Sequence, residues 1–333
     1  LTAMQKTGPP TMNRPTEPFE GLIGGRKSID YPFGAHPTND PHERVHDNTL
    51  EDVGHSLPFG RGLDDGFDVL LEPDGKEATE MVENSLQLFS RGYGSLRDSV
   101  RAFVEAITVD LMFGPSYLEI EFFWREDDME KKPVAFLLHA PPAETITERR
   151  NRYTQRVQGA PGGEIQLVSA DIVRIDLPKQ LRADADALVA LNRAGSRESL
   201  VSTDFVTGAF GRRTGFDVKA HRALLDEVVL TGTRASGWTA RGFYAEGLLD
   251  PARAWRALTL ARFQVAVRDI AIAALQRALD RAGEAIGFSV TMTLSRVLTS
   301  EDITKMEAAL ADGSRPISEL THPFLRPATR SQD

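Results

Sequence analysis

The chain contains no cysteine among its 333 residues. This absence excludes disulfide bonds, thiolate metal sites and cysteine nucleophiles. Long apolar runs are also missing, because the most apolar stretch, residues 257–279, is broken by Arg262, Arg268, Asp269 and Arg277. A membrane span there would bury these charges in hydrocarbon, so we expect no membrane-spanning helix and no membrane partner. The N-terminal residues lack the apolar segment of a secretory signal, and we therefore expect a non-secreted protein.

Positive charge is in short supply, since 39 Lys and Arg residues face 48 Asp and Glu residues, giving a formal net charge of −9. A protein that grips nucleic acid phosphates usually shows the opposite balance. The acidity belongs to the first half: residues 1–150 carry a net charge of −12, and residues 151–333 carry +3. This division permits complementary contacts between neighbouring copies of the chain.

Residues 1–75 are predicted to form an extended, proline-rich arm. Eight of the 19 prolines fall within residues 1–60, where no helical or strand-like apolar period is sustained. Proline removes backbone donors and interrupts helices, so this segment cannot build a core alone. We expect the arm to lie on another surface, such as a neighbouring subunit.

Residues 76–178 predict helices followed by a small antiparallel sheet. Ser95 and Asp98 resemble a capping box for a helix that ends at Gly114, and its apolar residues follow helical spacing. Apolar and charged residues then alternate in a strand, and a second strand after a charged turn completes a hairpin. The strands that we predict span residues 117–124, 133–138, 153–157, 165–168 and 172–177.

The second half is predicted to be mainly helical. Asp250 and Pro251 form a strong helix start, and the helix that follows extends to about Ala282. Other helices are expected at residues 179–193, 218–230 and 299–311, loops at 195–217 and 232–247, and a strand at 288–294. The fold class is therefore α+β, a small antiparallel sheet packed with helices, and we divide the chain into regions 1–75, 76–178, 179–250 and 251–333.

One metal-binding pattern occurs in the arm, where His42, Glu43 and His46 have the spacing HExxH. On a helix this spacing places two imidazoles on one zinc ion, so a metal-dependent hydrolase is one hypothesis, with His36 or His55 as a further ligand. The neighbouring prolines and the lack of an apolar helix face favour exposed polar residues instead. We accordingly expect no metal site and no cofactor.

Arginine is concentrated in two places. Arg212 and Arg213 lie in a glycine-rich loop that lacks the Gly-Lys-Ser/Thr of a Walker A motif. The long helix carries Arg253, Arg256, Arg262, Arg268, Arg277 and Arg281 against Asp269 and Asp280, a net charge of +4. We expect contacts with DNA or a neighbouring subunit at Arg212, Arg213, Arg253, Arg256, Arg262 and Arg268; a solvated basic helix face is the alternative.

Other candidate catalytic features are weak. Glu119 and Glu121 share one strand face, and we expect them to form the solvated outer face of the hairpin rather than a catalytic pair. The acidic turn at residues 126–128 lacks the spacing and glycine of an EF-hand. Since no G-x-S-x-G nucleophile elbow is present either, we do not expect an enzyme.

A series of short motifs resembles the portal proteins of tailed bacteriophages, and their order carries the resemblance. Residues 111–120, LMFGPSYLEI, resemble the family's step from a helix into a strand. The motifs that follow in the family's order are KPVAF at 132–136, APP at 140–142, RYTQ at 152–155, DIVRI at 171–175, FSVTMTL at 288–294, TSED at 299–302 and the segment from Gly313 to Glu319. Together they span residues 95–178 and 251–320.

The resemblance implies a structural ring protein without covalent chemistry, typically of about twelve subunits, at one vertex of a capsid. Its channel passes double-stranded DNA during packaging and ejection, and the ring binds terminase, capsid protein and a tail or adaptor protein. Residues 76–178 would be wing-like, 179–250 would hold stem-like helices and a clip-like loop, and 251–333 would be wing- or crown-like. The chain would be located in the virion, and in the host cytoplasm during assembly.

The chain departs from the family in being short, in lacking a large C-terminal crown, and in residues 195–247, which match poorly. Another phage head, tail or adaptor protein without a DNA channel is therefore an alternative function. The acidic composition agrees with a channel, because each cation that binds phosphate would add friction to moving DNA.

Overall fold

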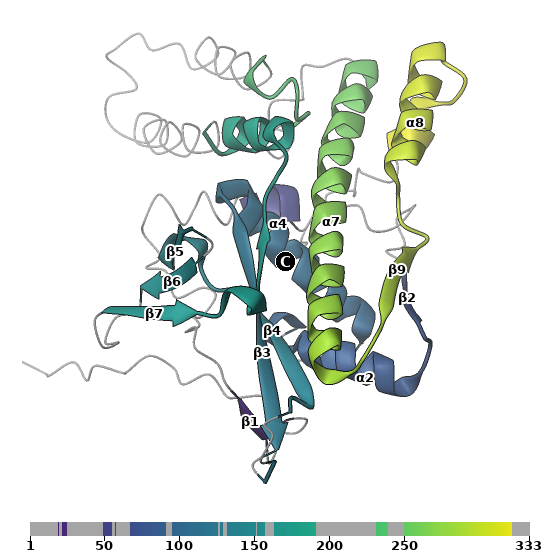
Figure 1. Cartoon of the computed structure of the whole chain (residues 1–333). Helices are drawn as coiled ribbons and strands as arrows, with labels where there is room; N and C mark the ends of the chain where they lie inside the picture. The colour runs from purple at the N-terminus through teal and green to yellow at the C-terminus, as the bar shows by residue number, and fades with distance from the viewer. Residues whose placement is uncertain are drawn as a thin grey trace, which may run out of the picture.

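The computed structural model describes residues 19, 22–24, 49–54, 57, 67–90, 95–125, 127–128, 132–150, 152–156, 163–190, 231–238 and 250–321. In this part the chain combines helices with three small antiparallel sheets, which confirms the mixed α+β class (Figure 1). The helices are α2 (Lys76–Ser85), α3 (Gln87–Ser90), α4 (Leu96–Phe113), α7 (Asp250–Ile286), α8 (Ser300–Asp312) and α9 (Ile317–Thr321). Residues 179–190 are also helical, and short helical turns occupy Leu50–Gly54, Ala143–Thr145 and Ser169–Asp171.

The strands pair in antiparallel fashion throughout the described residues. They are β1 (Leu22–Gly24), β2 (Asp68–Glu72), β3 (Ser116–Arg125), β4 (Ala135–His139), β5 (Ile146–Arg149), β6 (Arg152–Arg156), β7 (Glu164–Leu167), β8 (Ile172–Ile175) and β9 (Thr291–Ser295). β3 is the centre of the largest sheet: Glu119 pairs with both β4 and β8, and Phe123 pairs with both β4 and β1. β8 and β1 therefore share one edge of β3, opposite β4.

Both ends of α4 are capped by side chains. The Ser95 hydroxyl accepts a hydrogen bond from the Asp98 amide at 3.2 Å, as the sequence predicts. At the other end, the Arg182 guanidinium donates to the carbonyl oxygens of Leu111 and Met112 at 2.6 and 2.5 Å. The last carbonyls of a helix lack partners within the helix and carry partial negative charge, so a cation stabilises them. Arg182 thereby joins the helical segment 179–190 to the end of α4.

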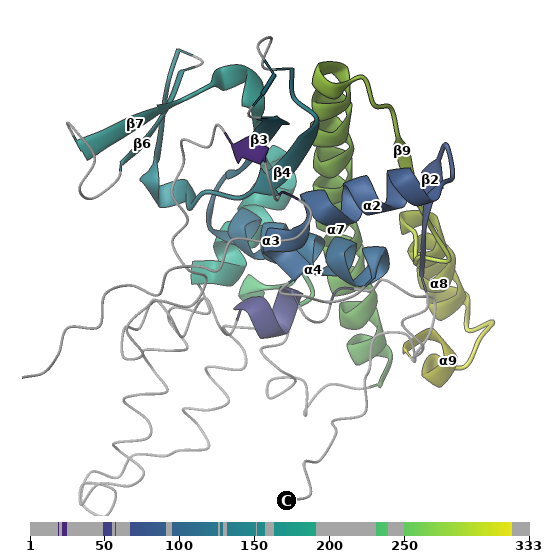
Figure 2. The ribbon, with the colours of Figure 1, turned by 90° about the horizontal axis from the view of Figure 1, so that it is seen from below.

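The hydrophobic core joins segments that are far apart in the sequence. One face of β3, with Leu118 and Ile120, packs with α4 and with the middle and C-terminal part of α7. α7 runs past the sheet beside α4, and its N-terminal half packs on α8 (Figure 2). Leu258, Val265 and Leu279, three of the residues that recur every seven positions, are fully buried. The 37-residue helix is thus held along its length by apolar packing.

The predicted arm is not separate from this core, and that expectation is corrected for its described residues. Val53 is fully buried in the main core, and the Phe19 ring lies 4.5 Å from that of Phe123. β1 extends the central sheet and β2 pairs with β9. β1 and β2 lie on their own chain because β3 and β9 have accessible edges. The unpaired backbone groups of such edges form hydrogen bonds with another strand.

The remaining predictions of secondary structure agree in type and differ mainly at element ends. The helix that begins at residue 179 is confirmed to residue 190, and the strand expected at 288–294 is found at Thr291–Ser295. β5 has no counterpart among the predictions. The predicted loop at 195–217 and the helix at 218–230 lie outside the described residues.

Candidate functional site

The arginines of α7 were the main candidates for contact with DNA or a neighbouring subunit. The helix extends over Asp250–Ile286, so Asp250 and Glu284 join its acidic residues and the net charge is +2 rather than +4. Four of its six arginines, Arg256, Arg262, Arg268 and Arg281, bind groups of their own chain through bonds described below.

Arg256 binds the turn formed by residues 231–238. Its guanidinium donates to the hydroxyl of Thr233 and, at 2.7 Å, to the carbonyl oxygen of Trp238. Burial lowers the pKa of Arg256, but an arginine remains charged at neutral pH. The contact fixes the chain to α7 shortly before the helix begins.

Arg262 and Arg281 bind α7 to other elements. Arg262 forms an ion pair with Glu307 of α8. Arg281 donates to the carbonyl oxygen of Ile172 in β8 at 2.7 Å. These contacts give both arginines a structural role within the subunit.

Arg268 is the clearest correction. It is 1% exposed, and its guanidinium donates to Asp269 at 2.7 and 2.9 Å. A side chain that the core encloses is not available to DNA or to a second subunit. The helical period that buries Val265 and Ala271 also turns Arg268 inward, and its long stem fills core volume.

Arg277 is exposed and forms no ion pair with the described residues, and Arg253 is exposed as well. Arg212 and Arg213 lie outside the described residues. Most of the α7 arginines therefore bind groups of the same subunit, and the structure does not support a continuous DNA-binding face on α7.

Glu119 and Glu121 are buried, at 5% and 7% exposure, so the expected solvated outer face is wrong. The Glu119 carboxylate lies 3.6 Å from Nδ1 of His139, directly across the β3–β4 pair. β1 covers Glu121, since a side chain added at Gly24 would come within 2.8 Å of its Oε1. The alternation along β3 correctly placed Glu119 and Glu121 on the same face of the strand. It could not show that this face is covered, because the covering strand comes from residues about 100 positions earlier in the sequence.

The step from α4 into β3 holds a titratable carboxyl group. Asp110 sits in the last turn of α4 and accepts a hydrogen bond of 3.3 Å from the Ser116 hydroxyl. Burial raises the pKa of Asp110 to about 7, and the nearby Glu144 carboxylate contributes in the same direction. The hydrogen bond from Ser116 opposes this shift only in part.

Stability should therefore depend on pH through Asp110. In the unfolded chain this carboxyl has a pKa near 3.9, so between about pH 4 and pH 7 the folded state binds the proton more tightly. The free energy of unfolding should fall as pH rises across this window. Asp110→Asn should remove the slope and raise stability at pH 8 by roughly 1–2 kcal/mol, after allowance for solvent screening. Urea unfolding at pH 5 and pH 8 measures the effect, and equal slopes in both proteins would contradict it.

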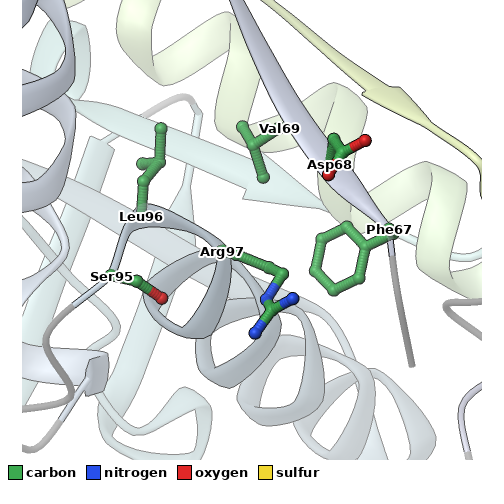
Figure 3. Close-up of a pocket in the computed structure, with 6 residues that line it drawn as sticks. All are labelled: Phe67, Asp68, Val69, Ser95, Leu96 and Arg97. Atoms are coloured by element: carbon green, nitrogen blue, oxygen red, sulfur yellow. The ribbon is translucent and has the colours of Figure 1, made fainter. Parts of the chain in front are cut away.

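A shallow pocket of about 290 Å³ lies between β2 and the start of α4 (Figure 3). It is lined by Phe67, Asp68, Val69, Ser95, Leu96 and Arg97. Its hydroxyl group, from Ser95, caps α4, and its carboxylate, from Asp68, pairs with Arg296 at 2.6 Å. Its guanidinium, from Arg97, lies 3.9 Å from the Asp98 carboxylate. All three polar groups already have partners, so we do not assign a reaction centre to the pocket.

No group of three His, Asp or Glu side chains suited to a metal ion occurs within the described residues. His42, Glu43 and His46 lie outside them, as do His36 and His55. Among the helices that the structure describes, none is both long enough and apolar enough to span a membrane.

No protein-family model matches the chain, and no curated protein matches it.

Proposed function

We propose that this chain is the subunit of a portal-type ring at a capsid vertex, which conducts double-stranded DNA and binds terminase and a tail or adaptor protein. One observation carries the proposal. The two separate segments that resemble portal proteins, 95–178 and 251–320, pack into a single core. α4 and β3 from the first segment contact α7 from the second, and α7 also contacts β8.

The intervening region supports the same function. The two described parts of this region, the helical segment 179–190 and the turn at 231–238, both lie near the N-terminal end of α7 (Figure 1). Arg182 and Arg256 fix these two points to α4 and α7. Both segments are thus fixed at one end of the core, as the two bases of a stem with a distal clip require.

The electrostatics suit passage rather than binding. The chain carries a net charge of −9, and four of the six α7 arginines bind their own subunit. A channel with few available cations forms few phosphate contacts, and each missing contact lowers the friction on moving DNA. The energy for movement would come from a separate terminase ATPase, and the subunit itself would perform no covalent chemistry.

Mass measurement tests this function directly. Light scattering coupled to size exclusion, with negative-stain imaging, should show rings of about a dozen subunits with a central hole. A stable monomer across the micromolar range would contradict the proposal. A ring with no central hole would instead favour a head or tail component without a DNA channel.

A further inference from the structure

Two surface regions of opposite charge lie on opposite sides of the subunit. The first, which we call the arginine hairpin, is residues 146–156, comprising β5, β6 and their turn. The second, which we call the acidic edge, is residues 68–85, comprising β2, α2 and their connection. Figures 1 and 2 show the two regions on opposite sides of the central sheet and α7.

The arginine hairpin concentrates positive charge in a small area. It holds Arg149, Arg150, Arg152 and Arg156 against Glu148, a net charge of +3, and all four arginines are exposed. Glu148 already forms an ion pair with Arg174 of β8, so it does not neutralise the hairpin. Arg149 and Arg152 stand directly opposite each other in the β5–β6 pair. Like charges at such positions destabilise a hairpin, which is the kind of local conflict that a binding partner relieves.

The hairpin projects away from the main core. It belongs to the three-stranded sheet β5–β6–β7, which the described part of the chain does not join to either of the other sheets. A small apolar cluster anchors it, in which the rings of Tyr117 and Tyr153 meet edge to face at 5.9 Å. The base of the hairpin is therefore fixed while its charged end extends into solvent.

The acidic edge has the complementary composition. It holds six carboxylates and one lysine, a net charge of −5. Glu77, Glu80 and Glu83 recur every three residues along α2, where like-charged neighbours repel. Lys76 pairs with Glu80 at 3.3 Å, and Asp68 pairs with Arg296. The other four, Glu72, Asp74, Glu77 and Glu83, form no ion pair with the described residues.

We propose that the arginine hairpin of one copy binds the acidic edge of the next copy. This contact rests on the proposed ring function and specifies how the ring is held together. It joins two different patches, so it is head-to-tail and generates a closed ring where the rotation between copies closes. Bringing the patches together relieves the repulsion within each, and bidentate bonds from guanidinium to carboxylate set the orientation.

Charge reversal tests the contact. Arg149→Glu combined with Arg152→Glu should raise the protein concentration needed for assembly at least tenfold. Glu77→Lys combined with Glu83→Lys should have the same effect. A chain carrying all four substitutions should assemble again, because its two patches are complementary once more. Arg277→Glu combined with Arg315→Glu changes the charge equally at other exposed arginines and should assemble normally. Assembly is measured by light scattering, with circular dichroism to verify folding.

Cysteine cross-linking gives a second readout that does not require closed rings. Because the natural chain has no cysteine, Arg152→Cys and Glu77→Cys proteins can be mixed and oxidised without competing thiols. Disulfide-linked dimers should form between the two proteins, whereas Arg277→Cys mixed with Glu77→Cys should give far fewer. Cross-linking without closed rings would support the contact and contradict the ring.

The outcomes separate this contact from the proposed function. Rings that form normally in both reversed pairs would overturn the contact and leave the ring function standing. If the natural chain does not assemble and the cysteine proteins form no cross-links, both the contact and the ring function are overturned. If the arginine-reversed protein retains its rings but loses affinity for duplex DNA in fluorescence anisotropy, the hairpin binds nucleic acid, and the contact between copies is overturned.

Discussion

Gly237→Ala is expected to separate the turn at residues 231–238 from α7 and to destabilise the fold by roughly 3–5 kcal/mol. The Gly237 backbone has φ of +73°, a left-handed conformation that side chains rarely adopt. A Cβ at this position would lie 2.3 Å from the Arg256 carbonyl oxygen and 2.6 Å from the Leu260 amide nitrogen. Both obstacles are backbone atoms of α7, which cannot move aside as a flexible side chain would.

Gly163→Ala is the matched control. Gly163 has the same φ of +73°, but a Cβ there would meet nothing within 4 Å. Alanine at Gly163 should therefore show the conformational strain alone, about 1 kcal/mol. Urea unfolding of both variants measures the difference, which isolates the close approach of the turn to α7. Equal losses in the two proteins would mean that the turn does not pack on α7 as described.

This contact also bears on the proposed ring. Arg256 binds the turn through Thr233 and Trp238, shortly before α7 begins. In the proposed ring, a stem formed by residues 179–250 would depend on this attachment for its direction.

The elements that could be predicted from the sequence are those with local signals. Ser95 with Asp98 predicted the start of α4, and Thr299 with Asp302 has the same spacing at the start of α8; both caps are formed. Such caps depend on residues three positions apart, so the local sequence is sufficient to predict where the helix begins. β5 was missed because its four residues include only one apolar side chain and offer no alternation.

The errors concern burial, which depends on distant partners. Glu119 and Glu121 have the pattern of a solvated strand face, and they are buried because β1 and β4 close around them. The sequence of the arm sustains no helical or strand-like apolar period, yet Val53 lies in the same core as residues of α4. In both cases the contact that buries the side chain joins residues many positions apart. The spacing of residues within one segment cannot predict such a contact.

The candidate site was affected in the same way. Six arginines on one helix predict a basic face, but a helical period cannot reveal which arginines other elements will bind. Arg262 forms an ion pair with Glu307 on α8, and Arg281 donates a hydrogen bond to a carbonyl oxygen of β8. A denser group of exposed arginines lies on the β5–β6 hairpin, where four arginines within eight residues could have been noticed in the sequence.

Arg268→Ala is expected to destabilise the fold by roughly 3 kcal/mol or more. The side chain is among the largest that are fully buried, so its removal leaves a cavity in the interior. It also breaks the ion pair with Asp269, whose carboxylate is itself 56% exposed and will regain water. Most of the loss should therefore come from packing rather than from Asp269.

Arg277→Ala on the same helix is the control, since Arg277 is exposed and forms no ion pair with the described residues. Its unfolding free energy should stay within about 0.5 kcal/mol of the natural chain. Chemical unfolding measures stability, and fluorescence anisotropy with duplex DNA measures binding under the same salt conditions. If Arg268→Ala left stability unchanged and weakened DNA binding, Arg268 would be a surface contact after all. The expected result, a large loss of stability for Arg268 and almost none for Arg277, would assign α7 to the framework of the subunit rather than to a DNA-binding surface.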